Sequence, residues 1–335
     1  MVDNQERYNP IYFTERSVCP VCAGRNGIEF YRSPLDEEPI RGFIASHYET
    51  QGTVDWNKLA GTDYVLRECQ TCFLIYQVNV PLDAMLYDIY CVMVAPGPLA
   101  QLEKQRLTLE NFNQIASELE TLFQLTGKHP SDVTFLDYGF GHGRWARVAR
   151  GMGATVFGIE HGEDKEREAA QLGIAIVSDA EIDAMRFDIV HTEQVFEHLV
   201  NPGRDFKRLA RITDHVFKVA VPRPGDIRQL VQRHGMTNQS PLAKYVGGAR
   251  LTMDDESYNA IFPLEHLNAY SDRTIEYLAS QTDMELISRA RRCAPRVDLS
   301  TARSAVRSGK RILSPLYRKA ASDQGYYILK PRASA

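Results

Sequence analysis

Four of the six cysteines form two Cys-x-x-Cys pairs, Cys19–Cys22 and Cys69–Cys72. Four thiolates presented in this way are typical ligands of a tetrahedral Zn²⁺ ion. The 46 residues between the pairs exceed the roughly 15–20 of compact zinc patterns, but loop-closure entropy grows only slowly with length. We therefore predict one closed, structural zinc site, with two unrelated reduced pairs as the alternative. The remaining cysteines, Cys91 and Cys293, we expect to be buried single thiols.

A second chemical signal is the pattern D-x-G-x-G-x-G at residues 137–143, which follows an apolar run and opens a helical stretch. Glycines there let the backbone approach a ligand at the carboxyl edge of a parallel sheet. A dinucleotide-binding pattern would need glycine where Arg144 stands. The acid that opens the pattern suits a cationic ammonium group, and S-adenosylmethionine (SAM) carries an amino group and no phosphate. Glu160, after the next apolar run, is placed to accept both ribose hydroxyls.

The elements that must position these residues alternate along the chain. Short apolar runs predict strands at 133–138, 155–160, 174–177, 187–192 and 216–221. Helical stretches separate most of them, at 143–152, 164–172 and 202–212. This alternation predicts an α/β fold with a doubly wound, mostly parallel sheet, to which 284–288 and 326–329 add two last strands.

Three regions follow from this pattern. Residues 1–96 form a small zinc-stapled module, 97–128 a linking helix, and 129–335 the cofactor-binding domain. The helical periodicity of the linking helix covers 102–125. Within the last region, the irregular stretch 222–270 is expected to act as a lid over the active site. The segment 286–320 is a basic insertion with ten Lys or Arg residues and one acid.

Composition narrows the class of protein. With 44% hydrophobic and 24% charged residues, the 335-residue chain is an ordinary globular sequence. It has no run of about 18 apolar residues and no apolar signal segment, so we expect no membrane span and a cytoplasmic location. A net charge of −4 argues against a dedicated nucleic-acid binder. The basic insertion fits the phosphates of a sugar conjugate, an anionic membrane surface or simply a charged exterior.

On these residues the chain resembles the class I SAM-dependent methyltransferases. The resemblance is carried by FLDYGFGHG (135–143), by Glu160, and by FDIVHTEQVFEHLVNP (187–202), and it covers about 133–287. It implies a seven-stranded Rossmann-like sheet. It also implies cofactor contacts: the methionine end at Asp137, Gly139, Gly141 and Gly143, the ribose at Glu160, the adenine amino group at Asp179, and the cleft wall at Glu193 and Gln194.

The N-terminal half resembles the zinc-binding leader of the bacterial deoxysugar C-methyltransferases, through CPVC, ECQTCFLIYQ and LYDIY. The resemblance places Tyr90 and the pair Glu197–His198 in the catalytic site, with His198 either the general base or a structural residue. We read His266 as a packing residue, and His191 as a surface or strand-end residue.

The resemblance implies methylation, at oxygen or carbon, of a small-molecule acceptor: a sugar, an anionic nucleotide-sugar or a glycan precursor. The alternatives are another small-molecule or natural-product acceptor, and a zinc-ribbon protein that binds or modifies RNA.

Overall fold

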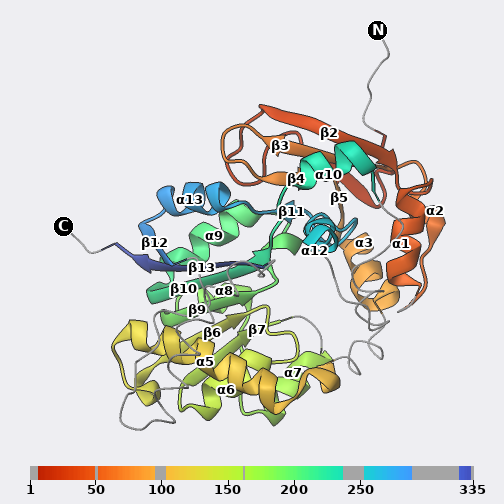
Figure 1. Ribbon diagram of the computed structural model, residues 1–335. Helices are drawn as coiled ribbons and strands as arrows, with labels where there is room; N and C mark the ends of the chain where they lie inside the picture. Colours follow the sequence, from red (N-terminus) through yellow and green to blue (C-terminus); the bar gives the residue numbers. More distant parts are fainter. Residues whose placement is uncertain are drawn as a thin grey trace, which may run out of the picture. The chain divides into compact units, whose positions relative to one another are not determined.

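The computed structural model describes residues 7–49, 52–94, 103–160, 163–236, 253–288 and 324–332 (Figure 1). Its contacts divide the chain into two compact units. Unit 1 comprises residues 1–106, 196–204 and 221–278, and unit 2 comprises 107–195, 205–220 and 279–335. The chain therefore passes between the units several times, so each unit is built from segments far apart in the sequence.

Unit 2 contains a seven-stranded sheet in the order β12-β13-β10-β9-β6-β7-β8. The pairs β10–β9, β9–β6, β6–β7 and β7–β8 are parallel, whereas β12 and β13 are antiparallel. The predicted doubly wound α/β sheet is thus confirmed. The strands are β6 (Thr134–Tyr138), β7 (Thr155–Ile159), β8 (Ala175–Ile176), β9 (Phe187–Glu193), β10 (Thr213–Pro222), β12 (Met284–Ser288) and β13 (Gln324–Pro331).

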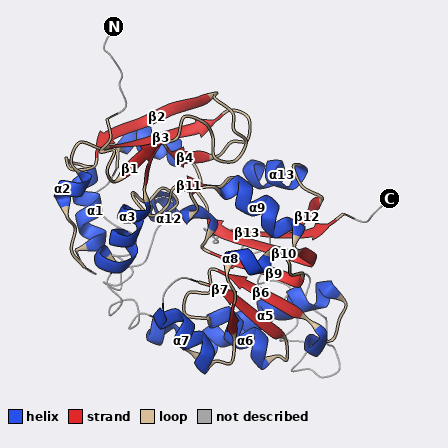
Figure 2. Cartoon of the chain, turned by 180° about the vertical axis from the view of Figure 1, so that it is seen from behind, coloured by secondary structure: helices blue, strands red, loops and turns tan. Residues whose placement is uncertain are grey.

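Helices cover both faces of this sheet, as Figure 2 shows. One face packs against α5, α6 and α7 in a core that includes Leu119, Ala146 and Phe135. On the other face Phe206 of α9 packs against Phe217 of β10, with ring centroids 5.0 Å apart. Burial on both faces explains why the strands read as continuous apolar runs. The helices are α5 (Leu109–Thr126), α6 (Arg144–Gly151), α7 (Glu163–Gln171), α8 (Asp179–Ile182) and α9 (Pro202–Arg211).

Of the helix expected over 102–125, the structure forms a short helical stretch at 103–106 and then α5, which begins at Leu109. Thr108 sets this start because its side-chain oxygen accepts a hydrogen bond from the backbone N–H of Asn111 at 3.2 Å. Of its apolar side chains, Ile115, Leu119 and Leu122 are buried, whereas Leu109 at the start of the helix is 83% exposed.

Unit 1 has a four-stranded sheet, β11-β4-β3-β2, and a two-stranded sheet, β1-β5. Its core is rich in aromatic side chains, including Phe43, Tyr64 and Phe262. The strands are β1 (Phe13–Glu15), β2 (Gly27–Pro34), β3 (Asp63–Cys69), β4 (Ile75–Gln77), β5 (Asn79–Pro81) and β11 (Asn268–Ala269). The helices are α1 (Ile40–Tyr48), α2 (Trp56–Leu59), α3 (Asp83–Asp88), α10 (Ile227–His234), α12 (Met253–Asn259) and α13 (Asp272–Ser280).

Two predicted regions, the lid at 222–270 and the basic insertion at 286–320, lie only partly within the described residues. The described residues of the stretch 222–270 belong to unit 1, and its role as a lid stays a prediction. The basic insertion 286–320, with Cys293, lies outside the described residues from 289 onward. Among the described residues, no helix has the length and apolar character needed to cross a membrane.

Candidate active site and metal centre

The glycine-rich turn joins β6 to α6. Gly139, Gly141 and Gly143 all have positive φ, at 79°, 54° and 65°. A Cβ atom at Gly139 would lie 2.4 Å from Val195, and one at Gly143 would lie 2.4 Å from the ring of Phe140. A Cβ atom at Gly141, in contrast, would meet nothing within 4 Å. The turn is therefore closely packed at its two ends and open at its middle glycine, where a ligand could approach the backbone.

Asp137, at the head of the pattern, is buried beside a histidine. Its Oδ1 lies 2.7 Å from Nδ1 of His191, and Nε2 of His191 lies 3.0 Å from Nζ of Lys218. Because an ammonium group can only donate, Nε2 of His191 accepts and Nδ1 carries the proton that it donates to Asp137. Burial raises the pKa of Asp137 to about 8, although the positive charge of Lys218 opposes that shift.

This row of polar groups crosses three neighbouring strands. Asp137 pairs with His191, and His191 pairs with Lys218, in the registers of β6, β9 and β10. His191 and Lys218 are both fully buried, so the expectation that His191 is a surface or strand-end residue is wrong. Lys218 also forms ion pairs with Glu193 and, at 3.5 Å, with Glu118. No role was predicted from the sequence for Glu118 or Lys218. The signal that could have identified them is a charged residue at a position that the apolar pattern of its strand or helix predicts to be buried.

Two other predicted cofactor residues of unit 2, Glu160 and Asp179, differ in what their carboxylates contact. Glu160 lies against the turn, where its Oε2 accepts the backbone N–H of Gly141 at 2.7 Å. Asp179 begins α8 and forms an ion pair with Arg208. The structure thus brings Glu160 to the glycine turn, whereas the carboxylate of Asp179 is held by an arginine.

Gln194 follows β9 directly and has an unusual backbone. Its φ of +56° lies in the left-handed region, which non-glycine residues rarely adopt, and such residues cluster at functional sites. Its buried side-chain nitrogen has no hydrogen-bond partner among the described residues. A bound ligand with an acceptor group would satisfy this donor. Together with the open space at Gly141, this donor makes the site fit a cofactor such as SAM.

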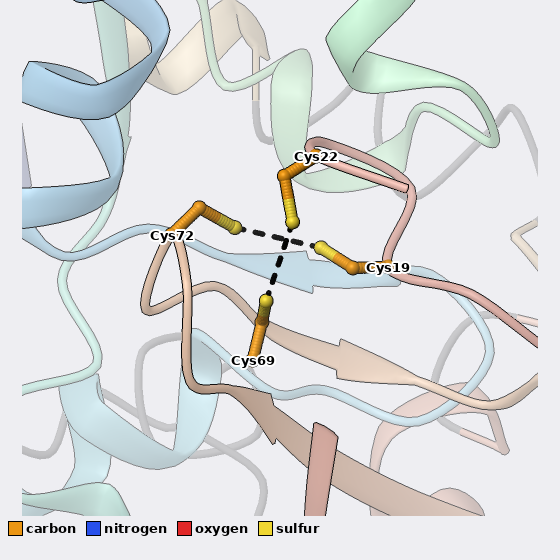
Figure 3. A group of neighbouring side chains, drawn as sticks. All are labelled: Cys19, Cys22, Cys69 and Cys72. Carbon is orange, nitrogen blue, oxygen red and sulfur yellow. Dashed lines mark hydrogen bonds between the residues drawn. The ribbon is translucent and has the colours of Figure 1, made fainter. Parts of the chain in front are cut away.

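The four paired cysteines gather at one point in unit 1, as Figure 3 shows. The Sγ atoms of Cys19 and Cys72 are 3.5 Å apart, and those of Cys22 and Cys69 are 3.4 Å apart. Sulfurs around a tetrahedral zinc ion, with Zn–S bonds of about 2.3 Å, would be separated by about 3.8 Å. The observed separations are close to that value, so the donor set fits Zn²⁺.

The two cysteine pairs have the same local geometry. In the first, the N–H of Ala23 donates to the carbonyl of Cys19, and Ala23 has a φ of 58°. In the second, Phe73 donates to Cys69 and has a φ of 60°. The long spacing arises because β2, α1, α2 and β3 lie between the pairs. Cys91, expected to be buried, is exposed on the π-helix Ile89–Met93.

The predicted catalytic residues also meet within unit 1. The hydroxyl of Tyr90 lies 3.0 Å from Nδ1 of His198, although 108 positions separate them in the chain. Glu197 is fully buried, with Oε1 4.0 Å from Nε2 of His198. His266 packs its ring against that of His198, with centroids 4.8 Å apart. The π-helix that carries Tyr90 is a rare element that often marks functional sites.

The model of a methyltransferase domain family matches residues 105–289, more than half of the chain. The chain belongs to this methyltransferase family. No curated protein sequence matches it significantly. The family match and the α/β sheet establish a SAM-dependent methyltransferase.

Several solved structures resemble this methyltransferase at low identity. The plantazolicin methyltransferase BpumL in complex with SAH (S-adenosylhomocysteine) is 14% identical over 74% of this chain and 93% of its own, with a TM-score of 0.45. PKMT2 from Rickettsia typhi, in complex with AdoHcy, is 12% identical over 65% of this chain and 53% of its own, with a TM-score of 0.40. The complex of the Haloferax volcanii Trm112 methyltransferase activator with a putative methyltransferase gives 13% identity over 72% of this chain and 96% of that chain, with a TM-score of 0.41.

Proposed function

We propose that this methyltransferase transfers the methyl group of SAM to an oxygen or carbon atom of a sugar, a nucleotide-sugar or a glycan precursor. One observation carries the proposal: the hydrogen bond between Tyr90 and His198. It joins the two residues that the resemblance to the deoxysugar C-methyltransferases makes catalytic, and they come from distant parts of the sequence.

The cofactor residues follow from the glycine turn. SAM supplies an electrophilic methyl group on a sulfonium. The carboxylate of Asp137 and the backbone of Gly139, Gly141 and Gly143 would hold its methionine end, and Glu160 its ribose. Gln194 would donate its free amide hydrogen to the cofactor, beside Glu193. Asp179 would reach the adenine amino group only after exchanging its ion pair with Arg208.

On the acceptor side, His198 is the proposed base. Its Nδ1 is also 3.0 Å from the backbone carbonyl of Glu265, which can only accept, so Nδ1 carries the proton and Nε2 has a lone pair. The acceptor forms its new bond to the methyl carbon as the carbon–sulfur bond breaks and SAH leaves. The acceptor's proton passes to Nε2 of His198. Tyr90, with 43% of its surface exposed, can orient the acceptor, and Glu197 faces the base.

We also propose that Cys19, Cys22, Cys69 and Cys72 bind one structural Zn²⁺ ion. The near-tetrahedral separations and the matched geometry of the two pairs support this assignment. Four thiolates fill the coordination of zinc, which leaves no open position for catalysis. The ion would hold the Cys19–Cys22 pair against the turn between β3 and β4, which carries Cys72.

A second acceptor class is favoured by exposed side chains on the helical segment that carries Tyr90. Tyr87, Tyr90 and Val92 expose 66%, 43% and 46% of their surfaces. Such a surface suits an acceptor with an apolar or aromatic ring, such as a natural product outside carbohydrate chemistry, as well as the apolar face of a sugar ring.

The first experiment is a calorimetric titration of the zinc-loaded chain with SAH, with NAD as the control. Saturable binding of SAH alone is expected. Nucleotide-linked keto sugars, free sugars and aromatic hydroxy compounds are then screened for transfer of a labelled methyl group. Absence of SAH binding would contradict the cofactor assignment. Transfer to aromatic compounds alone would contradict the sugar acceptor.

A further inference from the structure

Glu265 places a carboxylate in a cluster of ring side chains in unit 1. Its Oε2 accepts a hydrogen bond from the hydroxyl of Tyr48 at 2.9 Å and lies 3.2 Å from Nε2 of His47. Both partners stand at the end of α1. Only 14% of the Glu265 side chain is exposed, so these partners rather than water fix its orientation.

The carboxylate is held in its charged form. Burial by itself would raise the pKa of Glu265. The hydrogen bond with His47, together with the positive charge that His47, His198 and His266 can carry, outweighs burial and lowers this pKa to about 2. Glu265 therefore supplies a fixed negative charge to the cluster at any pH at which the enzyme would work.

The same residue acts on His198 through its backbone. The carbonyl of Glu265 accepts from Nδ1 of His198, which leaves the lone pair on Nε2. Burial lowers the pKa of His198 below its usual 6.5, whereas the charge and the carbonyl of Glu265 both raise it. His198 is therefore neutral near pH 7, with its lone pair available, and gains a proton next to a negative charge.

His266, whose ring packs against that of His198, does not compete for that proton. Burial and the neighbouring imidazole of His198 lower the pKa of His266 to about 3, so His266 stays neutral. Among the described residues, the titratable groups that contact His198 or the carboxylate of Glu265 come from four segments and are His47, Tyr48, Tyr90, Glu197, Glu265 and His266.

We propose that Glu265 is a positioning residue for His198: its carbonyl fixes the tautomer of the imidazole, and its carboxylate, held by His47 and Tyr48, stabilises the imidazolium formed when His198 takes the acceptor's proton. The direction of proton transfer rests on the proposed function. The arrangement resembles the way a base is oriented by a third group in nucleophilic catalysis.

The test needs no acceptor. The ¹⁵N-labelled, zinc-loaded full chain is titrated with acid and base while the imidazole nitrogens are followed by NMR, and His198 is assigned with a His198→Asn variant. We expect the Nδ1–H tautomer for His198. In Glu265→Gln, which keeps the carbonyl and the side-chain shape, the tautomer should persist while the pKa of His198 falls by about one unit, a tenfold loss of proton affinity.

The matched control is Glu68→Gln, which removes a carboxylate of the same unit that is paired with Arg228. It should leave the pKa of His198 unchanged. An unchanged pKa in a folded Glu265→Gln variant, or an Nε2–H tautomer in the unmodified chain, would overturn the proposal. The tautomer decides even if Glu265→Gln fails to fold. Failure to bind SAH would instead remove the proposed function and leave this NMR result standing.

Discussion

Oδ1 of Asp137 lies 2.7 Å from Nδ1 of His191, at the pair of strands where the cofactor site of the parallel sheet is expected. His191 is itself held by Lys218 from the next strand. The carboxyl group that would receive the cofactor's ammonium is therefore oriented by a row of buried polar side chains of the two neighbouring strands. This row provides a rigid support for one charged contact.

Replacing Asp137 should weaken cofactor binding. In Asp137→Asn the charge is lost but the shape is kept, and one charge-assisted hydrogen bond contributes roughly 1.5–3 kcal/mol, or about ten- to a hundredfold in affinity. Calorimetry with SAH measures this loss. The matched control is Asp188→Asn, a buried carboxylate that bonds to Thr134 and Lys128 at the other end of the same strands. Equal SAH affinities in both variants and in the unmodified chain would show that the site is misplaced.

Cofactor binding should also release a proton. Because burial holds the pKa of Asp137 at about 8, this group is mostly protonated at pH 7 in the free protein. A cationic ammonium beside it favours the ionised form, so SAH should displace close to one proton at pH 7 and almost none at pH 9. SAH affinity should then rise with pH up to about 8.

Proton release is measured from the dependence of the binding enthalpy on the ionisation enthalpy of the buffer. Asp137→Asn should abolish it while Asp188→Asn retains it. If the buffer has no influence at pH 7 although SAH binds, Asp137 does not meet the ammonium.

The sequence predicted the sheet because each strand is a short apolar run and each crossover a helical stretch, as for β6 and α6. It predicted the cysteine cluster because the Cys-x-x-Cys spacing alone defines a knuckle. These signals are local, so they can be recognised without knowledge of the tertiary structure.

Other features of the site depend on contacts that local patterns do not encode. The row from Asp137 through His191 to Lys218 requires the register of three strands. The contact of Tyr90 with His198 requires the π-helix Ile89–Met93, which has no sequence signature here. The left-handed conformation of Gln194 is equally unforeseeable, because glutamine seldom adopts it.

Loss of the cysteine cluster should destabilise unit 1. We expect one zinc per chain, and Cys69→Ser should lower both the zinc content and the melting temperature. Structural zinc can contribute roughly 10 kcal/mol in small domains, and each kcal/mol shifts Tm by about 2–4 °C in a domain of this size. A fall of roughly 20–40 °C is therefore expected in a thermal scan.

The control for this prediction is Cys91→Ser, which removes an exposed cysteine outside the cluster. It should change neither metal content nor Tm. A fully folded protein without metal, measured by elemental analysis, would rule out the structural role of zinc.

Removing the proposed base should separate chemistry from cofactor binding. In His198→Ala the affinity for SAH should stay within about twofold, because Tyr90, Glu265 and the other contacts of His198 all lie in unit 1 and none is a proposed cofactor ligand. Turnover of an acceptor identified by screening should fall by roughly 10²–10⁴-fold, the usual contribution of a positioned general base. His129→Ala, which alters an exposed histidine of unit 2, should leave both quantities unchanged. If His198→Ala retains full turnover, then the hydrogen bonds of His198 to Tyr90 and Glu265 serve only to hold the π-helix in place, and the proton of the acceptor is taken up by another group.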